Sequence, residues 1–133
     1  MTPAEAQSHL TDHFSTWVLD LNLAVTDVDE TRVVIRMPFT GRLERVGGTV
    51  SGQALSALAD TAMILALAGQ VGEFVPAATT DLHMQFLRPG TGDILARAEV
   101  VRLGKSLVFT RAELTAEDTG KTVALATATL ALP

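Results

Sequence analysis

Residues 54–68 read Ala-Leu-Ser-Ala-Leu-Ala-Asp-Thr-Ala-Met-Ile-Leu-Ala-Leu-Ala. These residues are strong helix formers, and apolar side chains fall on every side of the helix they would make. We predict a helix buried all round, opened by Ser51-Gly52-Gln53 and closed by Gly69 and Gly72. With fewer than about 18 uninterrupted apolar residues and Asp60 in its middle, it is predicted to be a core helix rather than a membrane span.

Segments on both sides of this helix have other periods. Before it we predict an amphipathic helix over residues 3–16, a β-hairpin from residues 19–28 and 31–38, and a polar surface loop over residues 41–48. After it we predict an antiparallel meander from residues 76–87, 93–103, 106–116 and 121–132, with hairpin turns at residues 104–105 and 118–120. One sheet that must surround one apolar helix has to curl around it, which predicts an α+β fold.

The composition indicates one globular domain over residues 1–133. Hydrophobic residues make up 47% of the chain and charged residues 19%, and no linker or repeat is present. Cysteine is absent, which excludes a disulfide framework, a thiolate zinc site and a cysteine nucleophile. The net charge is −5 and no basic run occurs, so neither nucleic acid nor a membrane is an expected partner. No signal peptide is recognised, and a cytoplasmic location is expected.

Asp60 is the residue most suggestive of chemistry. It is the only ionisable side chain between Arg45 and Glu73, in a stretch whose other side chains favour burial. A buried carboxylate is costly unless it is paired, hydrated or at a cleft. Two interpretations stay open: a structural Asp satisfied by the hydroxyl of Ser56 or Thr61, or a functional carboxylate of the kind that concentrates at active sites.

Gly52 stands at the start of the predicted helix, where unpaired N–H groups and the positive end of the dipole can stabilise an oxyanion. The alternative is a glycine that only eases the chain into the helix. Thr79 is, by itself, a typical strand residue. His9 and His13 have helical spacing but no marked third ligand, so no metal site is predicted.

Four segments carry a family likeness. They are residues 47–53 (Gly-Gly-Thr-Val-Ser-Gly-Gln), 58–62 (Leu-Ala-Asp-Thr-Ala), 79–89 (Thr-Thr-Asp-Leu-His-Met-Gln-Phe-Leu-Arg-Pro) and 104–109 (Gly-Lys-Ser-Leu-Val-Phe). In this order they resemble the hotdog-fold acyl-CoA thioesterases of the phenylacetate-degradation type, over about residues 17–132. The resemblance implies a curled six-stranded antiparallel sheet around a central helix, and homodimers that often pair into tetramers. It implies no cofactor beyond the CoA of the substrate.

The resemblance also implies roles for single residues. Asp60 stands where the family has its catalytic carboxylate, a general base or a nucleophile. Gly52 matches the glycine whose amide polarises the thioester carbonyl, and Thr79 matches the residue that orients the attacking water. Because CoA carries phosphates, cations are expected at the rim of the cleft. The alternative for each of them, taken singly, is an ordinary solvated charge. The candidates are Arg45, Arg88, Arg102 and Lys105.

The chain departs from the family pattern at the helix entry. Typical members have His-Gly-Gly where Ser51-Gly52-Gln53 stands, and an Asn where Arg45 stands. Ser51 is a good helix cap, and we keep Ser51, Gln53 and Arg45 as candidate substrate-binding residues. The expected activity is hydrolysis of a small aromatic or short- to medium-chain acyl-CoA. The alternative is a hotdog protein that binds acyl-CoA without catalysis. Dehydration of hydroxyacyl thioesters is disfavoured because the central helix has no histidine.

The spacing of Gly52 and Asp60 bears on assembly. Residues eight positions apart on one helix lie about 12 Å apart along its axis. Gly52 and Asp60 of one chain therefore cannot both contact the same carbonyl carbon. If both act on one thioester, the amide comes from a neighbouring subunit whose helix runs antiparallel. We predict two equivalent sites per dimer, each pairing Asp60 and Thr79 of one chain with Gly52 of the other; dimer against tetramer stays open.

Overall fold

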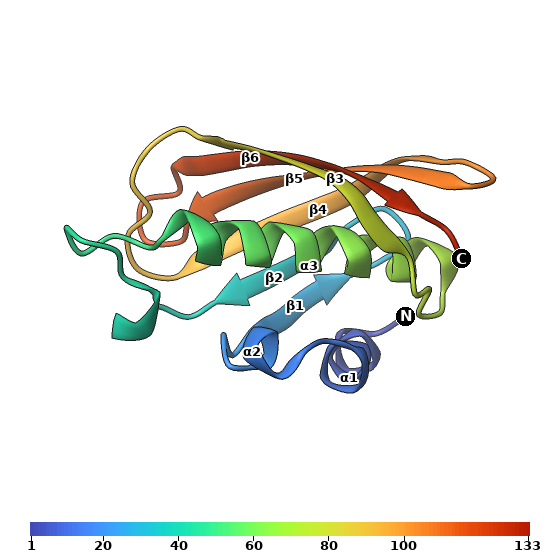
Figure 1. Ribbon diagram of the computed structural model, residues 1–133. Helices are drawn as coiled ribbons and strands as arrows, with labels where there is room; N and C mark the ends of the chain where they lie inside the picture. Colours follow the sequence, from blue (N-terminus) through green and yellow to red (C-terminus); the bar gives the residue numbers. More distant parts are fainter.

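Six strands form one antiparallel sheet, and the long helix α3 lies along one of its faces (Figure 1). The computed structural model describes residues 1–133. The strands are β1 (Ala24–Val28), β2 (Val33–Met37), β3 (Ala78–Phe86), β4 (Ile94–Leu103), β5 (Leu107–Ala116) and β6 (Thr122–Ala131). The helices are α1 (Pro3–His13), α2 (Thr16–Leu19), the single 3-10 turn η1 (Gly41–Leu43) and α3 (Gly52–Val71). The predicted α+β class is confirmed.

The strand order is β1-β2-β4-β5-β6-β3. Strands β4, β5 and β6 form the expected meander, with turns at the predicted residues. The prediction that the segment 76–87 pairs with the next strand was wrong. Strand β2 pairs with the edge of β4 that β5 leaves open, so β3 cannot pair there. Strand β3 pairs with β6 instead, with Leu82 opposite Ala128. Residues 87–93 carry the chain from this far edge to the middle of the sheet, which makes β3 an edge strand.

Helix α3 is capped at both ends by the residues that the sequence offers. Ser51 Oγ accepts a hydrogen bond from the backbone N–H of Ala54 at 3.2 Å. Gly72 ends the helix with a φ of +92°, a left-handed conformation that favours glycine. The side chains that α3 buries completely in the core include those of Leu58, Met63, Leu65 and Leu67.

The burial of α3 is incomplete along one side. Helix α3 is long and apolar enough to cross a membrane, and 67% of its most apolar 18-residue stretch is buried within the molecule. The prediction of burial all round was therefore wrong for one stripe. The partly exposed residues of this stripe are Gln53, Ser56, Ala57, Asp60 and Ile64. They recur at the helical period, so they share one side of the helix.

Gly69 lies inside α3 and does not close it, contrary to the prediction. The residue is buried, and a Cβ atom there would lie 2.9 Å from Val28 Cγ2 and 3.0 Å from the carbonyl oxygen of Asp29. Glycine at this position lets the helix backbone approach the β1–β2 hairpin closely.

The predicted N-terminal helix over residues 3–16 is shorter in the structure. Helix α1 ends at His13, where Phe14 becomes extended and sets its ring edge-on to Phe74 with the ring centroids 6.4 Å apart. The next residues form α2, so β1 begins at Ala24 rather than at residue 19. His13 stacks on Phe74 at 4.0 Å between ring centroids, and no group of three metal-ligating side chains occurs.

Replacement of Gly69 by alanine tests the close approach. Overpacking costs about 1–3 kcal/mol, whereas alanine gains about 1 kcal/mol over glycine in a helix interior. We expect Gly69→Ala to lower the free energy of unfolding by about 1 kcal/mol in urea denaturation. Gln70→Ala, at the exposed neighbour, should change it by less than about 0.5 kcal/mol. An equally stable Gly69→Ala protein would contradict the packing argument.

Candidate active site

Asp60 is held by the edge strand. The hydroxyl of Thr79, at the start of β3, donates a hydrogen bond to Asp60 Oδ1 at 2.7 Å. Asp60 lies on the partly exposed stripe of α3 and is half-buried. The Ser56 hydroxyl does not satisfy it, because that group donates to the Gly52 carbonyl at 2.7 Å. The hydrogen bond to Thr79 thus joins the central helix to β3 and leaves Asp60 Oδ2 without a protein donor.

A cleft with a volume of about 540 Å³ opens at Asp60. One turn after another of α3 contributes to it, and β3 and α2 contribute from either side of this helix (Figure 1). The residues that line it are Trp17, Gly52, Gln53, Ser56, Ala57, Asp60, Leu82 and Phe86. The carboxylate therefore faces a hollow with polar groups along the helix and large apolar groups beside it.

The first turn of α3 has free backbone donors. The N–H groups of Ala54 and Leu55 bond to the side chain and carbonyl of Ser51, whereas those of Gly52 and Gln53 have no acceptor within the chain. Such N–H groups, at the positive end of a helix dipole, suit a negative oxygen. The glycine also has a packing role, since a Cβ atom at Gly52 would lie 3.3 Å from Phe86 Cζ.

The predicted cations fall into two groups. Arg45 and Arg88 line a second cleft of about 460 Å³, which shares Gly52 and Phe86 with the first. Arg102 and Lys105 lie at the β4–β5 turn and line neither cleft. The structure brings the first pair together at the entry of α3 and leaves the second pair apart from Asp60 of the same chain.

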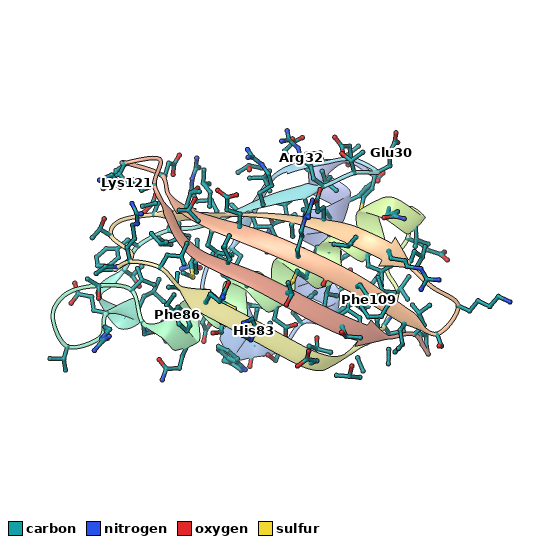
Figure 2. All side chains as sticks on the ribbon, turned by 90° about the horizontal axis from the view of Figure 1, so that it is seen from above. Glu30, Arg32, His83, Phe86, Phe109 and Lys121 are labelled. Carbon is teal, nitrogen blue, oxygen red and sulfur yellow. The ribbon has the colours of Figure 1, made fainter.

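The opposite face of the sheet holds a separate hollow of about 500 Å³. Figure 2 shows this face with His83 on β3 and Arg32 near the β1–β2 turn, both of which line the hollow. Its arginines largely meet carboxylates, since Arg111 bonds to Glu99 and Arg32 to Asp27. His83 is therefore on the other side of the sheet from Asp60 and does not line the cleft at Asp60.

Three apolar side chains of the Asp60 cleft were missed by the sequence interpretation as site residues. Trp17, Leu82 and Phe86 are 60%, 37% and 54% exposed, unusual values for large hydrophobic groups. In the sequence they are ordinary members of a helix and a strand. No signal marked them, because their role comes from the gathering of α2 and β3 around one stripe of α3.

The site within one chain is consistent with the spacing argument, without testing it. Gly52 and Asp60 stand on one continuous helix, about 12 Å apart along its axis. The sharing of a site between two chains stays a prediction.

Comparisons with known proteins identify the family of this chain. The family model described as the thioesterase superfamily matches residues 47–123. A protein named as a putative esterase in Halobacterium salinarum is 35% identical over 106 residues, which are 76% of this chain and 69% of that protein.

Solved structures show the same fold. The E. coli PaaI protein, from the phenylacetic acid degradation operon, is 25% identical with a TM-score of 0.84, covering 100% of this chain and 96% of that one. A thioesterase from Haemophilus influenzae is 22% identical with a TM-score of 0.87, covering 100% and 91%. The predicted hotdog fold is confirmed by these neighbours. Since the family model covers more than half of the residues, the chain belongs to the thioesterase superfamily.

Proposed function

We propose that this protein is an acyl-CoA thioesterase that uses Asp60 on water or directly on the thioester. The observation that carries the proposal is a half-buried carboxylate in mid-helix, bonded at 2.7 Å to the Thr79 hydroxyl and open to a cleft. Ionised groups are placed in such surroundings at a cost in stability, and they concentrate at active sites. The phenylacetate-degradation type, with a small aromatic or short- to medium-chain acyl group, is the finer form of this proposal.

The reaction needs a nucleophile and a place for the negative charge. As general base, Asp60 takes a proton from water while the water oxygen attacks the carbonyl carbon. The carbonyl oxygen becomes negative, the carbon–sulfur bond then breaks, and the CoA thiolate leaves and takes the proton from Asp60. As nucleophile, Asp60 would instead attack the carbonyl carbon and displace the CoA thiolate, and water would then hydrolyse the resulting mixed anhydride. Thr79 holds the carboxylate in either case and can accept a hydrogen bond from the water.

The Gly52 amide that stabilises the oxyanion comes, in this proposal, from a second copy of the chain. Small side chains, Ser56 and Ala57, lie on the exposed stripe midway between Gly52 and Asp60. A two-fold axis near them would set two α3 helices side by side and antiparallel, with each Gly52 opposite the other copy's Asp60. Strand β3 supports this arrangement because it is an edge strand with no partner on its outer side.

The CoA moiety would lie beside the cations at the proposed contact between the two α3 helices. Arg45 and Arg88 line the cleft that adjoins Gly52, so the phosphates would lie near the subunit that donates the amide. Arg102 and Lys105 stand at the other end of the sheet and would meet the nucleotide only through an assembled dimer or dimer of dimers. Ser51 acts here as a helix cap. Gln53 presents a free backbone N–H and an exposed side chain to the same contact between the helices. A cytoplasmic location, where acyl-CoA is available, completes the proposal.

Replacement of Asp60 by asparagine tests the carboxylate. General-base catalysis contributes about 10²–10⁴-fold, so Asp60→Asn should lower kcat for acyl-CoA hydrolysis by at least about 100-fold. Thiol release from an acyl-CoA panel measures turnover, and calorimetry with CoA measures binding, which should persist. Asp12→Asn makes the same change on the exposed side of α1 and should leave kcat unchanged. If wild type and Asp60→Asn bind acyl-CoA but release thiol equally slowly, the protein is a non-catalytic binder.

Replacement of Gly52 by proline removes the proposed oxyanion donor and adds a Cβ atom beside Phe86, and Gly52→Ala is the control for that added atom. Gly52 is the first residue of α3, where proline is well tolerated, and Ser51 has the extended backbone that proline requires before it. We expect Gly52→Pro to lower kcat about 10²–10³-fold, the usual effect of losing one such donor. Gly52→Ala adds a Cβ atom beside Phe86 but keeps the N–H, so it should retain more than about a tenth of the activity. Equal losses in the two variants would assign the effect to packing.

Mixed dimers test the sharing of the site. If Asp60→Asn and Gly52→Pro chains are co-expressed with different tags, each mixed dimer has one intact site of its two. Random assembly makes half of the dimers mixed, so we expect about a quarter of wild-type activity, although each variant alone is inactive. Purification through both tags should enrich the activity further. A mixture as inactive as its components would place the complete site within one chain.

A further inference from the structure

The cleft at Asp60 has an apolar wall that hydrolysis of the thioester itself does not need. Trp17 on one side and Leu82 and Phe86 on the other are large hydrophobic groups with 60%, 37% and 54% of their surface exposed. The thioester carbonyl requires only the carboxylate, the hydroxyl and a backbone donor. Large apolar groups gathered around a catalytic carboxylate instead offer a surface to the part of the substrate beyond the carbonyl.

Trp17 is held in place by the structure of α2. The neighbouring Val18 is buried in the core, and its N–H donates to the carbonyl of Ser15 at 3.0 Å. The N–H of Asp20 donates to the carbonyl of Thr16, also at 3.0 Å. The short helix is therefore anchored by one side chain and closed by its own hydrogen bonds, which places Trp17 outside the core at a defined backbone position.

Trp17 also separates two hollows. It lines the cleft with Asp60, and it lines a further hollow of about 260 Å³ with Arg42, Leu43 and Ser51. Gln53 is shared by the same two hollows. Trp17 and Gln53 therefore lie between the two hollows, and Trp17 bounds the Asp60 cleft on the side of α2.

We infer that Trp17 is a specificity-determining residue that packs against the acyl group. This inference rests on the proposed thioesterase function and deepens it. The ligand chemistry is an acyl group with an apolar body, either an aryl ring or an alkyl chain of several carbons, which covers the indole face and the side chains of Leu82 and Phe86. Contact with aromatic rings and aliphatic surface favours such groups over acetyl, because an acetyl group has little apolar surface to bury against them.

The kinetic test compares three acyl-CoA substrates in three proteins. For phenylacetyl-CoA and hexanoyl-CoA, Trp17→Ala should lower kcat/KM by about tenfold or more, whereas acetyl-CoA should change by less than about twofold. Trp17→Phe keeps an aromatic face and should stay within about threefold of wild type for all three. A larger loss with phenylacetyl-CoA than with hexanoyl-CoA would identify an aryl ring as the acyl group that Trp17 selects. The reverse would identify an alkyl chain. Equal losses for all three substrates, or no loss, would overturn the inference.

The chain provides a second readout because Trp17 is its only tryptophan and it has no tyrosine. In the Asp60→Asn protein, phenylacetyl-CoA or hexanoyl-CoA should shift the fluorescence of Trp17 to shorter wavelength as water leaves the indole. Free CoA and acetyl-CoA, which carry the same nucleotide, should not. Identical responses to all four compounds would overturn the inference.

Two outcomes separate this inference from its premises. If wild type hydrolyses none of the substrates, the proposed function fails, while the fluorescence titration still decides whether an acyl group contacts Trp17. If Trp17→Ala dissociates an assembly that wild type forms in analytical ultracentrifugation, Trp17 is a subunit contact, and the inference is overturned.

Discussion

The packing of α3 against one face of the sheet is the constraint on which the rest of the molecule depends. The helix buries Leu58, Met63 and Leu65 completely and approaches the β1–β2 hairpin through Gly69. One sheet cannot cover a straight helix on every side, and the strand order leaves β3 as an edge beside it. A stripe of α3 therefore stays partly open, and the helical period places Asp60 on that stripe. The position of the candidate catalytic group is a consequence of how the core is packed.

The same arrangement balances the electrostatic cost of a carboxylate in an apolar helix. Partial exposure keeps Asp60 in contact with water, and the Thr79 hydroxyl supplies one strong hydrogen bond. Because that bond reaches across from β3, the carboxylate is oriented by a different element from the one that carries it. The first turn of the same helix presents the opposite polarity, with two backbone N–H groups that lack acceptors in the chain. Two copies brought together by α3 would combine these complementary features.

Local patterns predicted most elements, and their failures have physical causes. The strands after α3 and the turns at residues 104–105 and 118–120 follow from alternation and turn chemistry, which are short-range properties. The place of β3 beyond β6 was not predictable in this way, because pairing depends on which edges remain free. The residue type of Gly69 predicts a helix end, although its conformation is helical and its lack of a side chain allows the close approach to Asp29. The break after His13 similarly reflects the packing of Phe14 on Phe74.

Residue identity and helical geometry already specify the chemical groups of the candidate site and their separation. A lone carboxylate in an apolar helix, with Ser51 and Gly52 at its start, is fixed by residue identity and by the helical rise. It is the folded core that brings Thr79 to Asp60, places Arg45 and Arg88 at one cleft, and sets Trp17 and Phe86 around another. These contacts join residues far apart in the chain. They arise because burial of α3 draws α2 and β3 to its two sides, and that depends on the whole core rather than on any local pattern.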